Sequence, residues 1–545
     1  MHKYLVVGLL AVGCGLSDGV ALDEPRAPES SVEGAFSSPT ATLLDFTFTA
    51  KFTTASPLST SWARSQIDEQ MLFTIGHLNG DRSVGRLDKA QYGSIRSTRQ
   101  TDGRYAHSYT VKLPVSWGSK TNLPTTYTFT LPANVDYEGI EAFTAKYKAT
   151  CVDRSAHDVD SGSIWYYYRP RASGCTLASA DVVTVTATVA PSTLNTSGKY
   201  PEYHKVWEDG ALKVVAIFGK YEDGATAASD AGIAAYNAFV KALKTLFPGA
   251  TVTTSPASIP TSPGVAMPDV QFNATLPNGK KVQVNVLLVD NVRTAGPSFD
   301  ARYAELSTSA DLIAYNGHAG LGDNVRALAR KGRFVANQYL IVFMNGCDTF
   351  AYVDGTLAET RAKLNPGDAT GTKYMEFLTN AMPAFFQSVS PATLSVIKGL
   401  MSTSTPMTYD QILTSIDKSQ VVAVTGEEDN VFVPGMGGIG GTDVTPPPTG
   451  EIVKGEGSVA RNEEKRFSTA LLEPGKYVVT LTGTGDADLY VRAGTAPTTT
   501  SWDCRPYQSG SKETCTVTLS SKASLFVMVR GYAATSTFTV SGRAL

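Results

Sequence analysis

Two residues that can take part in covalent chemistry each follow a short apolar run that closes on Asn-Gly. His318 follows DLIAYNG (311–317), and Cys347 follows LIVFMNG (340–346). A thiol close to an imidazole can be deprotonated by the ring or held beside it as a thiolate. Neighbouring glycines let a substrate backbone approach closely and leave backbone N–H groups free to stabilise an oxyanion. The pair therefore predicts a reactive thiol, although either residue alone is more often structural.

The elements around this pair predict an α/β domain. Continuous apolar runs at 211–219, 282–290, 310–318 and 339–347 are typical of strands buried on both faces. Between the first two runs, apolar side chains recur at helical steps at Ile233, Tyr236, Val240, Leu243 and Phe247. Further helices are expected around 373–386 and 391–401, and a last strand at 421–426. In such a sheet, functional groups collect at the carboxyl ends of the strands, so His318 and Cys347 are expected at one edge.

These strand ends, Gly-His followed by a small residue and Gly-Cys followed by a polar one, resemble the caspase-fold cysteine peptidases, which include gingipain, clostripain, legumain and the caspases. The resemblance covers about residues 205–434. It implies that Cys347 is the nucleophile and His318 the acid/base of a Cys/His dyad. It also implies that the backbone N–H groups of Ala319 and Cys347 bind the oxyanion. The implied function is a bacterial cysteine endopeptidase, a hydrolase that acts on protein or peptide substrates and requires no cofactor.

Two residues depart from the pattern of that family. Ala319 stands where many members have Gly, and a positive φ there would be costly for alanine. Asp348 directly follows the cysteine, and its charge would raise the pKa of the thiol unless it points away. The alternative is therefore a catalytically inactive caspase fold that serves as an extracellular binding or adhesion module. Reaction of Cys347 with a thiolate-trapping reagent would discriminate between the two.

The other five cysteines fit an exported chain. Cys151 and Cys175 lie close together in the sequence, as do Cys504 and Cys515, so each pair is a candidate local disulfide in an oxidising compartment. Cys14 belongs to the N-terminal signal region. Cys347 is then the unpaired residue, and an unpaired cysteine in a secreted protein is either an inert core residue or a reactive thiol.

The N-terminal 200 residues contain an export signal, a tether and a β domain. A short basic start and an apolar stretch at 4–12 predict a signal peptide over 1–21. AVGC (11–14) resembles the bacterial lipoprotein box, which would make Cys14 the lipidated N-terminus, whereas the competing interpretation is cleavage after Ala21. Residues 22–40 are expected to be a disordered tether. Short β-branched and aromatic runs over 41–200 predict an antiparallel β-sandwich.

The C-terminal segment predicts a second small β-sandwich. A Gly/Pro-rich linker is expected at 435–455, between the caspase-like α/β domain at 203–434 and a β domain at 456–545. GDADLYVRAG, WDCRPYQSG and ETCTV, between 485 and 517, resemble the bacterial pre-peptidase C-terminal domain. The resemblance implies a Cys504–Cys515 disulfide. Asp486 and Asp488 are weak candidates for a structural calcium ion, and turn-forming aspartates are the more common case.

Composition and missing motifs exclude several other functions. Lys and Arg number 47 against 50 Asp and Glu, so there is no basic field for a nucleic acid. The sequence has no HExxH zinc motif, no GxSxG nucleophile elbow and no phosphate-binding loop after a strand. We expect no metal centre beyond the calcium candidate, and membrane contact only through an N-terminal lipid anchor. The expected location is extracellular, periplasmic or outer-membrane anchored, and the sequence does not indicate an oligomeric state.

Overall fold

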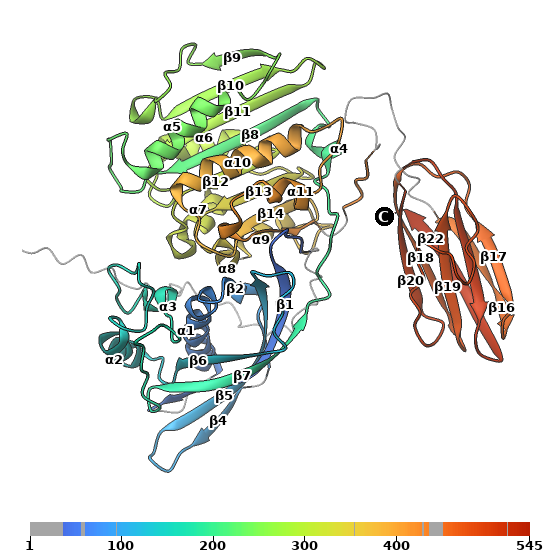
Figure 1. The fold of residues 1–545 in the computed structure, drawn as a ribbon, viewed down its shortest axis with the longest axis horizontal. Helices are drawn as coiled ribbons and strands as arrows, with labels where there is room; N and C mark the ends of the chain where they lie inside the picture. Colours follow the sequence, from blue (N-terminus) through green and yellow to red (C-terminus); the bar gives the residue numbers. More distant parts are fainter. Residues whose placement is uncertain are drawn as a thin grey trace, which may run out of the picture.

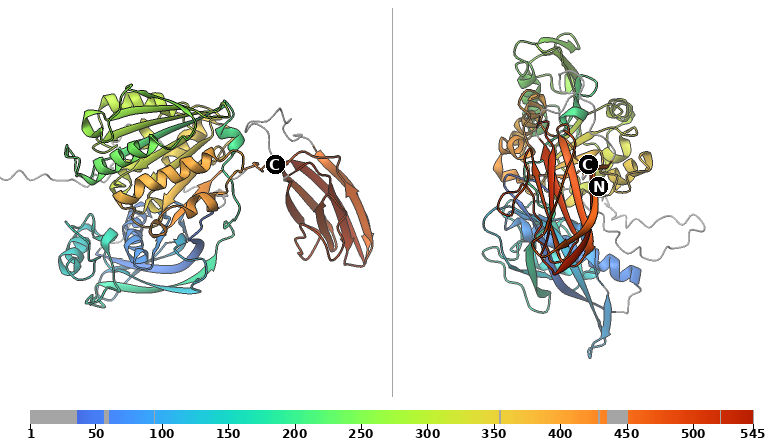
Figure 2. Two further views of the ribbon diagram at one scale, coloured as in Figure 1. Left: turned by 45° about the horizontal axis from the view of Figure 1, so that its top comes forward. Right: turned by 90° about the vertical axis from the view of Figure 1, so that its right-hand side faces the viewer.

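The computed structural model describes residues 36–544 apart from 56–59, 94, 354, 428–429, 435–450 and 520. The predicted signal peptide, Cys14 and most of the predicted tether and linker lie outside the described residues. Figures 1 and 2 show an N-terminal domain (blue) lying against a central domain (green to orange), with a C-terminal domain (red) beside them. No helix among the described residues is long and apolar enough to cross a membrane.

The N-terminal domain is one antiparallel sheet covered by helices. Its main strand order is β2-β5-β1-β7-β6, and β3 and β4 pair with β5. The elements are β1 (Thr42–Thr54), α1 (Thr60–Asn79), β2 (Ser83–Gly85), β3 (Gln91–Tyr92), β4 (Arg96–Arg99), β5 (Tyr105–Trp117), β6 (Thr126–Pro132), α2 (Tyr137–Tyr147), α3 (Ile164–Tyr167) and β7 (Val182–Pro191). In β1, alternate side chains are buried and exposed, as expected for a sheet with one covered face.

The predicted β-sandwich in this region is therefore wrong, because helix α1 occupies the place of a second sheet (Figure 1). Ile67, Met71, Ile75 and Leu78 are fully buried and recur at three- and four-residue steps, which is the pattern of a helix face. The buried Gln70 joins this helix to the sheet, because its Nε2 donates to the carbonyl oxygens of Lys51 and Pro132. One face of the sheet is covered in this way.

The central domain is built on an eight-stranded mixed sheet of order β15-β14-β13-β12-β8-β11-β10-β9. Its strands are β8 (Ala211–Gly219), β9 (Thr251–Ser255), β10 (Asp269–Thr275), β11 (Lys281–Val289), β12 (Leu312–Asn316), β13 (Leu340–Asn345), β14 (Met375–Asn380) and β15 (Val422–Gly426). Its helices are α4 (Tyr203–Val206), α5 (Ala231–Leu243), α6 (Pro297–Ser307), α7 (Asp323–Lys331), α8 (Thr349–Tyr352), α9 (Thr356–Leu364), α10 (Phe386–Met401) and α11 (Tyr409–Thr414). Helices α5 and α10 lie across one face (Figure 1).

The expectation of a largely parallel sheet holds for its middle strands and not for its edges. Strands β11, β8, β12, β13 and β14 are parallel, whereas β9, β10 and β15 are antiparallel. The helix expected around 373–386 is also wrong, because Met375–Asn380 is a strand buried on both faces. Its polar Glu376, which interrupts the apolar pattern, is held inside by an ion pair with Lys199.

The C-terminal domain is a small β-sandwich. A four-stranded sheet, β16-β22-β18-β20, lies with a three-stranded sheet, β17-β21-β19, around one apolar core. The strands are β16 (Glu451–Ala460), β17 (Glu464–Ser468), β18 (Gly475–Thr484), β19 (Ala487–Ala493), β20 (Glu513–Leu519), β21 (Leu525–Gly531) and β22 (Thr535–Ala544). The first strand thus begins inside the segment predicted to be linker.

The N-terminal and central domains share one continuous apolar core. Residues 36–38, predicted to be disordered tether, are buried between them. The Phe36 ring packs edge-on against Phe350, with ring centroids 6.0 Å apart. Ser37 pairs with Val424 of β15 through both backbone groups. These two domains are therefore joined by packing as well as by the chain.

Candidate functional site at the carboxyl edge of the central sheet

Strands β12 and β13 bring the two predicted site residues to the same edge. The strands are parallel neighbours, with Asn316 opposite Asn345. The glycines that follow are in close contact, since a Cβ added to Gly346 would lie 2.7 Å from the Gly317 carbonyl oxygen and 3.3 Å from the Ala319 nitrogen. The loops that bear His318 and Cys347 therefore adjoin, as the sequence predicted.

A buried amide network holds the two strand ends behind the site. Asn345 Nδ2 donates to Asn316 Oδ1 at 2.9 Å, and Thr393 Oγ1 donates to the same oxygen at 2.7 Å. Asn345 Oδ1 accepts from Asn380 Nδ2 and Gln420 Nε2. Because each of these buried hydrogen bonds restrains a side chain at a strand end, the network positions both loops. This network was not predicted from the sequence, although the repeated Asn-Gly pair was a signal for it.

The His318 ring is exposed and oriented by its neighbours. Its Nε2 lies 3.2 Å from the Tyr221 carbonyl oxygen, which can only accept a hydrogen bond. The proton of the neutral ring is therefore assigned to Nε2, which leaves the Nδ1 lone pair free. The rings of Tyr221 and Phe386 lie 5.3 Å and 5.2 Å from the imidazole, centroid to centroid. The Tyr315 hydroxyl donates to the His318 carbonyl oxygen at 2.7 Å, which fixes the backbone.

Cys347 is half-buried, and its thiol is held in the neutral form. Burial, together with the charge of Asp348, raises the pKa of the thiol to about 12. The sulfur lies 3.8 Å from the Ala384 carbonyl oxygen, as expected for a weak S–H donor. A thiol with this pKa is almost entirely protonated at neutral pH, and the protonated form is a poor nucleophile.

Asp348 is fully buried, and burial raises the pKa of its carboxyl group to about 7. Asn79, at the end of α1, donates from Nδ2 to Asp348 Oδ1 at 3.2 Å. The backbone of Asp348 is left-handed, with φ of 51°. From the sequence, the charge of Asp348 was expected to raise the pKa of the neighbouring thiol, and in the structure this charge does oppose ionisation of the thiol.

The two predicted oxyanion donors are Ala319, which is buried, and Cys347, which is half-buried. Ala319 has φ of −66°, so alanine is unstrained there and the concern about a positive φ does not apply. Within the part of the chain that the structure describes, neither the Ala319 N–H nor the Cys347 N–H donates a hydrogen bond. Two unengaged N–H groups on adjoining loops can polarise a carbonyl oxygen placed between them.

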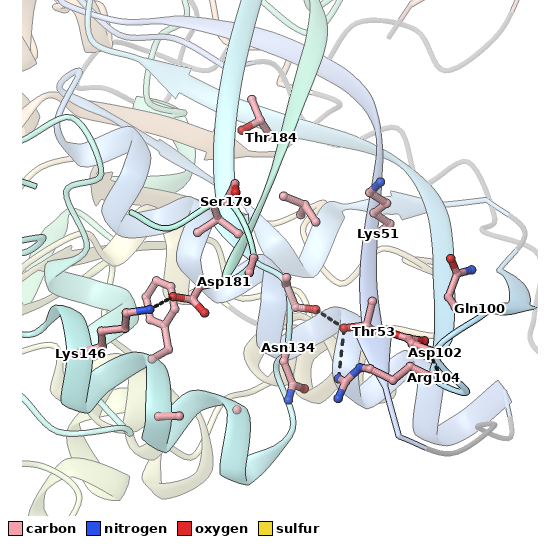
Figure 3. Close-up of a pocket in the computed structure, with 17 residues that line it drawn as sticks. Lys51, Thr53, Gln100, Asp102, Arg104, Asn134, Lys146, Ser179, Asp181 and Thr184 are labelled. Carbon is pink, nitrogen blue, oxygen red and sulfur yellow. Dashed lines mark hydrogen bonds and ion pairs between the residues drawn. The ribbon is translucent and has the colours of Figure 1, made fainter. Parts of the chain in front are cut away.

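A separate cleft of about 810 Å³ lies in the N-terminal domain (Figure 3). Charged side chains that line it come from β1, from the turn between β4 and β5, and from α2. Arg104 donates to Thr53 Oγ1 at 3.2 Å, and Lys146 pairs with Asp181. None of the predicted site residues lines this cleft, so we do not place the site there.

The remaining predicted site residues lie elsewhere in the structure. Disulfides join Cys151 to Cys175 and Cys504 to Cys515. Asp488 pairs with Arg505 at 2.9 Å, and Asp486 Oδ1 accepts from the Gly510 N–H. Arg505 thus places a positive charge beside Asp488, one of the two candidate calcium ligands. The calcium site stays a prediction. Among the described residues, no group of three or more His, Cys, Asp or Glu side chains is placed to hold a metal ion.

The first similarity to known proteins lies in the C-terminal domain. Its strands, its two sheets and its disulfide occupy the segment that the motifs singled out. Residues 464–531 match the bacterial pre-peptidase C-terminal domain. This domain accounts for the curated relatives as well, because their similarity to the chain lies in this region.

A zinc metalloprotease of Helicobacter pylori is 46% identical over 94 residues, which are 16% of this chain and 37% of the relative. A hemagglutinin/proteinase of Vibrio cholerae is 46% identical over 94 residues, 16% of this chain and 15% of the relative. An alkaline serine exoprotease A of Vibrio alginolyticus is 38% identical over 98 residues, 17% of this chain and 18% of the relative. The chain therefore spans well under half the length of these relatives.

Among solved structures, the solution structure of vEP C-ter 100 is 36% identical and covers 16% of this chain and 95% of its own, with a TM-score of 0.14.

The comparisons correct the predicted function. The relatives are named as a zinc metalloprotease and other proteases, and they share with this chain the pre-peptidase C-terminal domain and not a cysteine-peptidase domain. They do not support a cysteine endopeptidase with a Cys347/His318 dyad, nor do protease names support the inactive binding module. The structure also disfavours the thiolate that such a dyad would use, because burial and the charge of Asp348 raise the pKa of the Cys347 thiol.

Proposed function

We propose that this chain is an exported peptidase that acts on protein or peptide substrates at the carboxyl edge of the central sheet. The observation that carries the proposal is that an exposed imidazole and two backbone N–H groups, which donate to no acceptor among the described residues, lie on adjoining loops. The protease names of the relatives, together with the shared pre-peptidase C-terminal domain, support hydrolysis of peptide bonds. The two disulfides and the signal-like N-terminus support export.

The roles of the site residues follow from their chemistry. A substrate carbonyl oxygen between the N–H groups of Ala319 and Cys347 would be stabilised as negative charge develops on it. His318 Nδ1 would take a proton from a water molecule as the water oxygen bonds to the carbonyl carbon. The C–N bond would then break, and the protonated ring would give its proton to the leaving amine. The hydrogen bond from Nε2 to the Tyr221 carbonyl oxygen would stabilise the protonated ring during this exchange.

The test is cleavage of a peptide library by the purified full chain at a high ratio of protein to peptide, with new termini identified by mass spectrometry. His318→Ala should lower kcat/KM by roughly 100-fold or more, because general acid–base catalysis contributes about that much. The matched control Val335→Ala changes an exposed side chain of the same domain and should leave the rate unchanged. Absence of cleavage by the wild-type chain and by every variant, or equal rates for wild type and His318→Ala, would refute the proposal.

A further inference from the structure

The sheet of the N-terminal domain splits between two neighbouring strands. Strand β1 pairs with β7 over four residue pairs, and within the described residues this ladder ends at Thr47 opposite Thr188. Both strands extend further, because β1 continues to Thr54 and β7 begins at Val182. Beyond Thr47 the two strands therefore face each other as edges without a ladder between them. A strand edge of this kind is a template for pairing with another chain.

The cleft of about 810 Å³ lies in this split (Figure 3). Lys51 and Thr53 of β1 line one side of it, and Thr184 of β7 lines the other. If the ladder continued in the same register, Lys51 would lie directly opposite Thr184, so the cleft stands where the ladder is missing. Its volume falls in the range of about 300–1,000 Å³ that is usual for ligand-binding pockets.

At the end of β1 the split is as wide as one chain segment. Ala133 alone bridges it there, because its carbonyl oxygen accepts from the Thr53 N–H at 2.8 Å and its N–H donates to the Asp181 carbonyl oxygen at 2.9 Å. The buried Gln70 braces the same region, since its Nε2 donates to the Lys51 carbonyl oxygen at 2.9 Å. One extended segment of chain thus fits between the two sides.

The side chains of the cleft leave two cations without an ion pair. Lys146 pairs with Asp181. Arg104 Nη2 donates to a neutral hydroxyl of β1 at 3.2 Å, and within the described residues neither this guanidinium nor the exposed Lys51 ammonium pairs with a carboxylate. Asp102 accepts from the Arg104 N–H at 3.0 Å, so the lining holds three cations against two carboxylates. A ligand with an acidic group would complete the pairing.

We propose that this cleft binds an extended acidic peptide segment of another protein. The segment would lie between β1 and β7 and pair with the strand edges through its backbone, as in β-strand addition. Lys51 and Arg104 would bind a carboxylate side chain of the segment. This inference goes beyond the proposed peptidase activity and does not depend on it, because none of the predicted site residues lines the cleft.

The experiment measures the binding of synthetic peptide mixtures to the purified full-length chain by fluorescence polarisation. Each fluorescein-labelled mixture contains eight-residue peptides with one fixed position and random uncharged residues elsewhere. The fixed residue is glutamate, glutamine or lysine. The glutamate mixture should bind at least tenfold more tightly than the lysine mixture, with the glutamine mixture between them. No binding of the glutamate mixture, or equal affinities for all three, would overturn the proposal.

Two variants test the cations of the cleft. Lys51→Ala/Arg104→Ala should weaken binding of the glutamate mixture at least tenfold and leave the glutamine mixture unchanged. The matched control Lys120→Ala removes an exposed lysine of the same domain that does not line the cleft, so it should bind as the wild type does. If the double variant does not fold, Lys51→Ala, at an exposed side chain, decides the question. Undiminished binding by the folded variant would overturn the proposal.

Two further measurements test the place and the mode of binding. Ala142→Trp fills the cleft from α2 without a change of charge, and it should abolish binding of the glutamate mixture. The same mixture with every second backbone nitrogen methylated keeps its charge and loses the N–H groups that pair with one strand edge. Its affinity should fall at least tenfold. Unchanged binding by Ala142→Trp, or by the methylated mixture, would contradict addition of a strand in this cleft.

Discussion

At the residue scale, the pair Cys347 and Asp348 shows how burial controls ionisation. The aspartate lies in the interface with the N-terminal domain, where its carboxyl group has a raised pKa and its charge in turn opposes ionisation of the thiol. The sequence predicted that His318 and Cys347 would adjoin, because both end strands of one parallel sheet. It did not predict the contact of Asp348 with Asn79, because nothing local in the sequence links a residue to a partner 269 positions away.

Replacement of Asp348 by Asn should change how stability depends on pH. The carboxyl pKa is about 7 in the folded chain against 3.8 for the ordinary group, so folding takes up a proton between these values. The wild type should therefore lose stability as pH rises from about 4 to about 7, by up to about 4 kcal/mol. Asn keeps the shape, suits the left-handed backbone and carries no charge. We expect Asp348→Asn to be more stable than wild type at pH 8 and to lose that advantage near pH 4.

The measurement is urea unfolding of both proteins at pH 4, 6 and 8. Asp102→Asn, which changes an exposed acid in a loop of the N-terminal domain, serves as the control. An Asp348→Asn advantage that stayed constant across this pH range would contradict the buried neutral carboxyl.

At the element scale, the apolar runs of the central sheet predicted their strands well. Elements whose structure depends on contacts with distant parts of the chain were predicted poorly. Strand β8 begins and ends where its apolar run does, at Ala211 and Gly219. Strand β14 was predicted to be a helix, since its buried Glu376 breaks the apolar pattern and is stabilised by Lys199, which is far away in the sequence. Helix α1 was not predicted, although its face from Ile67 to Leu78 follows the helical period. Tertiary contacts decide such elements.

Replacement of Phe36 should weaken the joint between the N-terminal and central domains. The side chain is 1% exposed and packs on Phe350. Phe36→Ala should lower the free energy of unfolding by about 3–5 kcal/mol, the range for a large aromatic truncated in a core. Trp62→Ala, at a side chain that is 65% exposed, should cost less than about 1 kcal/mol. Denaturant unfolding measures both, and a loss below about 1 kcal/mol for Phe36→Ala would show that residues 36–38 are not docked.

At the scale of the whole molecule, three domains make two packing units. The apolar core that spans the N-terminal and central domains is continuous, and the pre-peptidase C-terminal domain has a core of its own. The sequence predicted the three domains and, through short motifs, the C-terminal sandwich. It did not predict the shared core, because that core arises from surfaces that meet only after folding.

Calorimetry of the full chain should therefore show two unfolding transitions. The N-terminal and central domains should unfold together, and the pre-peptidase C-terminal domain should unfold separately. Cys504→Ala/Cys515→Ala should lower the midpoint temperature of the C-terminal domain's transition and leave the other unchanged. This disulfide lies within that domain, and such bonds contribute about 2–4 kcal/mol to stability. Separate transitions for the N-terminal and central domains would contradict a shared core.

The central claim is that the carboxyl edge of the central sheet is a peptidase site. The most direct measurement is the rate of peptide cleavage by the full-length chain, compared with His318→Ala and with the control Val335→Ala. We predict that His318→Ala lowers kcat/KM by roughly 100-fold and that Val335→Ala leaves it unchanged. Cleavage that is absent from the wild-type chain, or that survives His318→Ala undiminished, would contradict the claim.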